Sequence, residues 1–339
     1  MLIAAALVLV LASTAGLVIH MLTYRSLEIR EEFLKLLDPS LVVVQLKPIN
    51  GDVYLLGYTR GDSSVVIYRY SPQSRALSSV TWGFEGNATV YPLKLIPSGD
   101  KILVPSLIGD RHHLLVLTYT KDLRLVSREQ YSVGEIVWVS SVETTDSASV
   151  VVGARYRTGY RLQYYVGLID PGSRQIREVM VWGTSDIDYL VEAYTVDSLL
   201  YAIGNSTVEG SVVYVINSKG WSVEASVKLP ATPLKSIVNG VEFTSLLNIN
   251  TTYYLCVITP LTYKLTCTEI AKPQLESYQV FSYSFWRDYL ILLGRGYRAD
   301  TKTIDALALF YHATRPGGLS LEKLLWISGE GVNSVLFDG

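Results

Sequence analysis

The sequence is poor in the residues that build metal sites and activated nucleophiles. Its 339 residues include 2 cysteines and 4 histidines. It contains no HExxH, CxxC, GxSxG, P-loop or strand–helix GxGxxG motif, so the signatures of zinc enzymes, serine hydrolases and nucleotide-binding proteins are missing. The net charge is −2 with no block of like charge, which disfavours a nucleic-acid partner. We therefore predict no catalytic residue, no metal and no cofactor, and that the protein is not an enzyme.

Charge is also missing from the start of the chain. The segment Met1–Tyr24, MLIAAALVLVLASTAGLVIHMLTY, has no Asp, Glu, Lys or Arg and is long enough to cross a bilayer core of about 30 Å. Apolar residues then recur at helical spacing at Ile29, Phe33 and Leu36–Leu37, until Asp38-Pro39 ends the pattern. The sequence predicts one continuous helix over residues 2–37, apolar first and amphipathic later.

From Leu41 onward the hydrophobic period changes from 3.6 to 2, and a repeat becomes visible. Six apolar segments each end in a residue that stops a strand or permits an unusual φ. These residues are Gly57, Pro105, Gly153, Gly204, Asn248 and Gly294, spaced 48, 48, 51, 44 and 46 residues apart. Four strands can be read around each segment, and four-stranded units that repeat every 40 to 50 residues are typical of propeller blades.

The predicted fold is therefore mainly β: a six-bladed β-propeller of four-stranded blades over residues 39–339, preceded by one long N-terminal helix over residues 1–38. A pair of β-sandwiches is the alternative, but it does not predict equal periods. The expected blades cover residues 41–82, 88–129, 136–182, 188–229, 233–270 and 278–326, with an extra strand at 332–337. The first strands of the units show no shared His, Asp, Glu or Arg. Asp186, Asp188 and Glu192 could reach a central channel, but nothing else in the sequence marks them.

The two cysteines lie in YYLCVITPLTYKLTC, where two extended runs flank a turn. If Leu261-Thr262 is the two-residue loop, Cys256 and Cys267 face each other across the hairpin, at a Cα separation of about 5.5 Å that suits a disulfide. Two reduced core cysteines are the alternative. Three sequons, at Asn87, Asn205 and Asn250, lie between predicted strands and are N-glycosylation candidates. Together with the cysteine pair they favour a location outside the cytoplasm.

The 24 tyrosines outnumber the 7 phenylalanines and 6 tryptophans. A tyrosine has an apolar ring and a hydroxyl that can stay in water, which suits half-buried strand faces. We expect the excess to lie on sheet surfaces, with a surface for partner contacts as the alternative.

The apolar start of the chain allows two interpretations. In one, it anchors a cell-surface propeller in a membrane. Arg25, Arg30 and Lys35 would then place the propeller in the cytoplasm by the positive-inside rule, which conflicts with the sequons and the cysteine pair. In the other, the helix packs against identical copies of itself, and small residues would allow a close approach. The residues expected in such a core are Ala4, Ala5, Leu9, Ala12, Ala15, Gly16 and Ile19.

An uncharged run of this length, continued by an amphipathic half and followed at once by a β-rich head, resembles the mature N-terminus of an archaeal type IV pilin. The resemblance covers about residues 1–40. It implies that a leader has been removed before Met1, that the helices form a filament core, and that the heads form its outer sheath.

The leading hypothesis from the sequence is a structural subunit of an extracellular archaeal type IV pilus-like adhesion filament. Its partners would be identical subunits, the membrane before assembly, and a surface or glycan receptor. The alternative is a membrane-anchored cell-surface β-propeller that binds a ligand or acts as a sensor.

Overall fold

The computed structural model describes residues 41–327, except 60–63, 72, 75, 85–87, 110–112, 135–136, 146–147, 158–160, 185, 240, 287–288 and 315–317. These residues are almost entirely β-strands and turns. Their contacts divide the chain into two compact units. The first contains the described residues of Met1–Trp82, Leu246–Leu255 and Cys267–Gly339, and the second contains those of Gly83–Ser245 and Cys256–Thr266.

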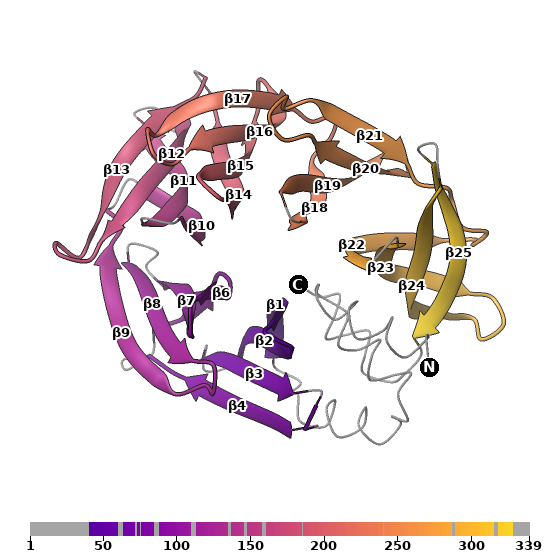
Figure 1. Ribbon diagram of the computed structural model, residues 1–339, viewed down its shortest axis with the longest axis horizontal. Coiled ribbons are helices and arrows are strands. Elements are labelled where there is room, and N and C mark those ends of the chain that lie inside the picture. Colours follow the sequence, from indigo (N-terminus) through magenta and orange to yellow (C-terminus); the bar gives the residue numbers. More distant parts are fainter. Residues whose placement is uncertain are drawn as a thin grey trace. The chain divides into compact units, whose positions relative to one another are not determined.

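Four of the sheets are four-stranded and antiparallel, with their strands in chain order (Figure 1). The first contains β1 (Leu41–Ile49), β2 (Asp52–Thr59), β3 (Val65–Ser71) and β4 (Ala76–Trp82). The second contains β14 (Asp188–Val196), β15 (Leu199–Ser206), β16 (Gly210–Asn217) and β17 (Ser222–Lys228). The third contains β18 (Pro233–Asn239), β19 (Glu242–Ile249), β20 (Thr252–Ile258) and β21 (Leu265–Glu269). The fourth contains β22 (Tyr278–Trp286), β23 (Tyr289–Arg298), β24 (Thr303–Thr314) and β25 (Gly318–Ile327).

The fifth sheet is larger and has nine strands. They are β5 (Val90–Pro92), β6 (Ile96–Ser98), β7 (Lys101–Ile108), β8 (His113–Thr120), β9 (Leu125–Ser132), β10 (Val137–Thr144), β11 (Ser149–Arg157), β12 (Arg161–Asp170) and β13 (Gln175–Trp182). A parallel pairing of Ser132 with Gln175 joins β9 to β13. The Ser132 amide also donates to the Arg174 carbonyl over 3.1 Å.

The predicted fold class is wrong in its details. The described residues form four separate four-stranded blades and one nine-stranded sheet, and not six separate blades. The physical reason is the β9–β13 connection, which merges the units predicted at 88–129 and 136–182. No helix occurs among the described residues, so none there could span a membrane. The predicted helix at 2–37 and the extra strand at 332–337 lie outside them.

The repeated glycine has a clear structural role. In four sheets the first strand bulges opposite the glycine of the second strand, immediately after the residue that pairs with that glycine. The pairs are Val43 with Gly57, Val139 with Gly153, Leu190 with Gly204, and Val280 with Gly294.

The bulges leave no space for a side chain at three of these glycines. A Cβ at Gly57 would lie 2.6 Å from the carbonyl oxygen of Val42. At Gly153 and Gly294 it would overlap the carbonyl oxygens of Trp138 and Gln279. The periodic glycine that the sequence shows is therefore the partner of a periodic bulge.

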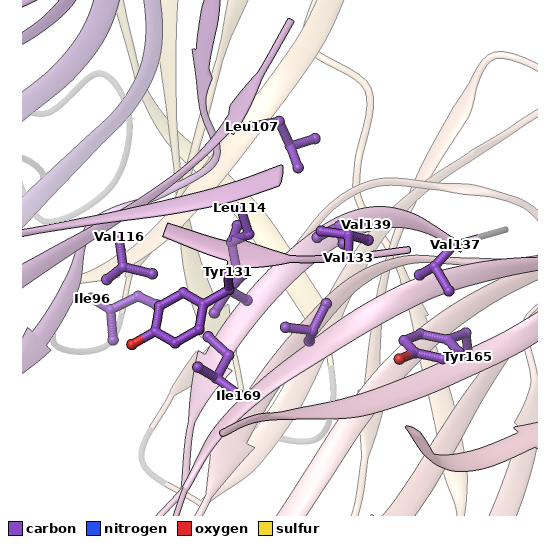
Figure 2. Packing of buried hydrophobic residues seen from close by; sticks show 12 residues of the cluster. Ile96, Leu107, Leu114, Val116, Tyr131, Val133, Val137, Val139, Tyr165 and Ile169 are labelled. Carbon is purple, nitrogen blue, oxygen red and sulfur yellow. The ribbon is translucent and has the colours of Figure 1, made fainter. Parts of the chain in front are cut away.

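Buried apolar side chains fill the spaces between strands and between neighbouring sheet segments. Within the nine-stranded sheet, Ile96, Tyr131, Val139 and Ile169 belong to one buried cluster (Figure 2). Tyrosine takes a larger share of the core than expected, because the largest fully buried side chains are seven tyrosines and one phenylalanine. They are Tyr54, Tyr119, Tyr164, Tyr165, Tyr201, Tyr283, Tyr311 and Phe243. The expectation that tyrosine lies mainly on half-buried faces is therefore wrong for these residues.

The predicted cystine is confirmed. Cys256 in β20 and Cys267 in β21 are disulfide-bonded, and these two strands are neighbours in their sheet. The disulfide therefore links the two outer strands of this blade covalently.

We predict that Gly153→Ala destabilises the protein by about 1–3 kcal/mol, because the added methyl group must push the Trp138 carbonyl aside. The midpoint of urea unfolding measures the change. Gly220→Ala is the control, because the nearest atom to its new methyl group, Ser222 Oγ, lies 3.8 Å away. Equal midpoints for both variants would show that the bulge does not require glycine.

Candidate functional site

The bulges also place a polar residue at the same register position in four first strands. The residues at which pairing resumes are Gln45, Ser141, Glu192 and Ser282. Glu192 is the one ionisable residue among them, and the other three are uncharged polar residues. The series was not recognised in the sequence, because the unpaired bulge residue shifts the spacing between strands.

Lys94 lies in the second unit between β5 and β6 and is 7% exposed. Its ammonium group forms an ion pair with Glu143 and donates to Ser141 Oγ over 3.4 Å. It also donates to the Ala193 carbonyl over 3.2 Å and lies 5.4 Å from the ring centroid of Tyr194. One buried lysine thus connects the chain before β6 to both β10 and β14.

The polar contacts continue from β14 to β18. The Tyr194 hydroxyl donates to the Ser236 carbonyl, and the Ser236 and Ser245 hydroxyls are 2.8 Å apart. Glu192 and Lys235 form a part-exposed ion pair at 3.6 Å. We call these residues, with Lys94, Ser141 and Glu143, the inner-strand cluster. Each charged group of the cluster faces an opposite charge, so the cluster is well suited to holding strands together.

A pocket of about 610 Å³ opens elsewhere in the second unit. Residues at the end of β13 and just after it, in the β15–β16 turn, and on β16 and β17 form its wall. They are Trp182, Gly183, Thr184, Val208, Glu209, Val212, Tyr214, Ser226 and Lys228. The wall is partly aromatic and partly polar, as is typical of pockets for small ligands.

Three aromatic rings pack together beside this pocket. The ring centroid of Tyr164, on β12, lies 5.3 Å from that of Trp182 and 4.9 Å from that of Tyr214. The Trp182 and Tyr214 centroids are 5.2 Å apart, in an edge-to-face arrangement. Gly204 makes this packing feasible, because a Cβ there would lie 2.7 Å from the Tyr164 ring. We call Tyr164, Trp182 and Tyr214 the aromatic trio.

Two buried polar atoms near the pocket have no hydrogen-bond partner among the described residues. They are the Trp182 indole nitrogen and Asp188 Oδ1. Asp188 is fully buried, and its other oxygen, Oδ2, accepts hydrogen bonds from the Thr184 backbone amide and from the Thr184 hydroxyl, the latter at 2.9 Å. A buried polar group without a partner costs about 1–3 kcal/mol, and more if it is charged. The protein thus keeps buried polar atoms beside its pocket at a cost to its folding free energy.

The tyrosines of the trio remain protonated at neutral pH. Burial raises the pKa of Tyr164 to about 12. Hydrogen bonding with Tyr214 and Ser206 opposes this increase, and the carboxylates of Asp188 and Glu209 add to it. Burial also raises the pKa of Tyr214, and contacts with Tyr164 and Glu209 raise it further. The Tyr214 hydroxyl donates to Glu209 Oε2 over 3.1 Å. Both phenols can therefore donate hydrogen bonds.

The structure does not gather the predicted site residues into one place. Asn87 and the proposed helix-core residues lie outside the described residues. Asn205 is in β15 and accepts a hydrogen bond from Ser211 over 2.7 Å. Asn250 is exposed in the β19–β20 turn, with φ 50°. Glycosylation at the three sequons stays a prediction.

The structure gives two of the acidic residues noted in the sequence separate environments. Glu192 belongs to the inner-strand cluster and pairs with Lys235. Asp188 lies under the segment that lines the pocket, where it holds Thr184. In the described part of the chain, no group of three or more His, Cys, Asp or Glu residues could hold a metal ion.

Sequence reasoning missed Trp182, Tyr164 and Tyr214. Each stands in an ordinary strand pattern, and they meet only because adjacent sheet segments pack through Gly204. The segment between β13 and β14 was the available signal for this site. It contains Thr184 and ends at Asp188, and both side chains can form hydrogen bonds.

Comparison with known proteins identifies the fold. No protein-family model and no curated protein matches the sequence. The structure resembles that of the periplasmic gluconolactonase of Pseudomonas aeruginosa at 13% identity, with a TM-score of 0.54, over 81% of this chain and 83% of that chain. The chain therefore has a β-propeller fold.

Two further solved structures give lower scores. The β-propeller domain of the Trilobed protease from Pyrococcus furiosus is 11% identical, with a TM-score of 0.41, and 88% of this chain and 98% of that chain are covered. A puromycin hydrolase is 12% identical, with a TM-score of 0.46, over 81% of this chain and 44% of that chain.

The prediction that the protein is not an enzyme does not hold, because the chain shares its fold with an enzyme, the periplasmic gluconolactonase. The prediction relied on missing sequence motifs. A site on a propeller can be assembled from single residues on separate sheets, which leaves no contiguous motif to find.

We predict that Lys94→Met lowers the free energy of unfolding by about 3–5 kcal/mol, because it leaves Glu143 as a mostly buried charge without its partner. Adding Glu143→Gln should recover part of the loss. Urea unfolding of the two single variants and the double variant measures the coupling. The control is Lys235→Met, which breaks a more exposed pair and should change stability by at most about 1 kcal/mol. A double variant as unstable as the sum of both single variants would contradict the assigned ion pair.

Proposed function

We propose that the protein is an extracytoplasmic β-propeller that binds a small polar ligand in the pocket beside the aromatic trio. One observation carries the proposal: Trp182, which lines a pocket of about 610 Å³, and Asp188, which is bonded to the lining residue Thr184, each keep a buried polar atom without a partner among the described residues. A ligand that hydrogen-bonds to these atoms would recover the free energy that they lose by burial.

The cystine supports the location. A disulfide between Cys256 and Cys267 persists in an oxidising environment and is rare in the reducing cytosol. The structurally similar gluconolactonase is itself a periplasmic protein. The uncharged segment Met1–Tyr24 would tether the propeller to a membrane, and the cystine favours the side of that membrane outside the cytoplasm.

The proposal is tested by screening the full chain, in detergent, against a library of small polar metabolites by thermal unfolding. A ligand present at 100 times its Kd should stabilise the protein by about 2.7 kcal/mol. The same ligand should stabilise Trp182→Phe much less, because that variant keeps an aromatic ring and loses the indole N–H. Trp138→Phe is the matched control, because Trp138 lies on β10 and does not line the pocket. If no compound stabilises the wild-type chain, or if every hit stabilises both variants as well as the wild type, the proposal is wrong.

We propose as a second candidate the filament subunit that the N-terminal sequence suggests. The observation that favours it is the run of small residues within an uncharged segment, which would let identical helices approach closely. The propellers would then cover the outside of an adhesion filament.

For the filament candidate, we predict that the full chain polymerises when detergent is removed and that Gly16→Leu prevents this, because a leucine blocks close helix packing. Negative-stain electron microscopy measures filament number. Val18→Leu is the control, since it changes the same segment while keeping a large apolar residue. Single particles from the wild-type chain, or unchanged filaments from Gly16→Leu, would exclude this packing.

A further inference from the structure

We infer that the pocket binds a neutral saccharide ring. This inference rests on the ligand-binding function proposed above and names the class of ligand. Trp182 and Tyr214 supply aromatic surface to the pocket wall. The C–H groups on one face of a sugar ring carry a small positive charge and pack against the negative face of an aromatic ring.

The two unpartnered atoms are one donor and one acceptor. The Trp182 indole N–H donates, and Asp188 Oδ1 accepts as a carboxylate oxygen. A sugar carries several hydroxyls, and each of them can donate one hydrogen bond and accept others. Hydroxyls of one sugar could therefore accept from Trp182 and donate to Asp188 without adding a charge to the pocket.

The charges around the pocket disfavour an anionic ligand. Glu209 and Lys228 both line it, and Asp188 adds a second carboxylate directly behind Thr184. Two carboxylates face one ammonium group, so a phosphate or a carboxylate ligand would meet net repulsion.

The packing of the rings disfavours an organic cation. An aromatic cage needs space between its rings for the cation, but the rings of the trio lie only 4.9–5.3 Å apart and fill that space themselves. Glu209 is already engaged by the Tyr214 hydroxyl, and Lys228 would repel a cation.

Saccharide entry also has a structural requirement. Asp188 is fully buried, and its Oδ2 is bonded to Thr184, which lines the pocket. The unpartnered Oδ1 is enclosed as well, so side chains around it must shift before a sugar hydroxyl can reach it. Thr184→Ser keeps the hydroxyl that holds Oδ2 and should retain binding.

Isothermal titration calorimetry on the full chain tests the inference. The detergent must have a polyoxyethylene head group, because a sugar head group would compete. The probes are the methyl glycosides of glucose, galactose and mannose, and N-acetylglucosamine, with inorganic phosphate and choline as the anionic and cationic probes. We expect at least one saccharide to bind, and phosphate and choline not to bind.

Two variants locate the binding site. Trp182→Phe and Asp188→Asn should each weaken saccharide binding about tenfold, because each removes or weakens one hydrogen bond to the ligand. The matched controls are Trp138→Phe and Asp170→Asn, which lie away from the pocket and should bind as the wild type does. The thermal midpoint of each variant shows whether it is folded, and if one variant is not, the other locates the site.

The outcomes separate the two proposals. If choline or phosphate binds and no saccharide does, the saccharide inference is wrong while ligand binding at the pocket stands. If a saccharide binds with the same affinity to Trp182→Phe and Asp188→Asn, it binds elsewhere and the inference is also wrong. If neither these probes nor the metabolite library gives a ligand, both the inference and the proposed function fail.

Discussion

The close contact between a bulged first strand and a glycine of the second strand is the constraint on which the sheets depend. The bulge turns a carbonyl oxygen toward the neighbouring Cα, as Trp138 does toward Gly153, and no side chain fits between them. The same bulge offsets the first strand by one residue. The residue at which pairing resumes is then polar, as at Ser141 and Glu192. The bulge thus determines both the geometry of the first strand and the position of its polar residue.

Gly204 extends this constraint to the pocket. It pairs with the residue before a bulge, as the other repeated glycines do, but its missing Cβ leaves room for the Tyr164 ring of a neighbouring sheet. Tyr164 can therefore pack against Trp182 and Tyr214. This packing buries the indole nitrogen of Trp182 without supplying a partner among the described residues. The glycine that the bulge requires therefore also allows the ring packing beside the pocket.

The sequence predicted the features that depend on local geometry. The glycine spacing reported a true structural repeat, and the hairpin around Leu261-Thr262 placed Cys256 opposite Cys267. The sheet count was not predictable, because the pairing of Ser132 with Gln175 is made by backbone groups that leave no side-chain pattern. The pocket was missed for a related reason. Its aromatic residues belong to separate strands, and only the absence of a side chain at Gly204 brings them together.

The inner-strand cluster and the residues beside the pocket differ in how well their buried polar groups are paired. Lys94 and Glu143 are enclosed, but each faces its counter-charge, and the lysine also reaches Ser141 and a carbonyl. Such a cluster stabilises the strands that it joins and has little left to offer a ligand. Asp188 is enclosed as well, yet one of its oxygens has no partner among the described residues. Because buried polar groups are nearly always satisfied in folded proteins, the unsatisfied carboxylate is the better sign of a ligand.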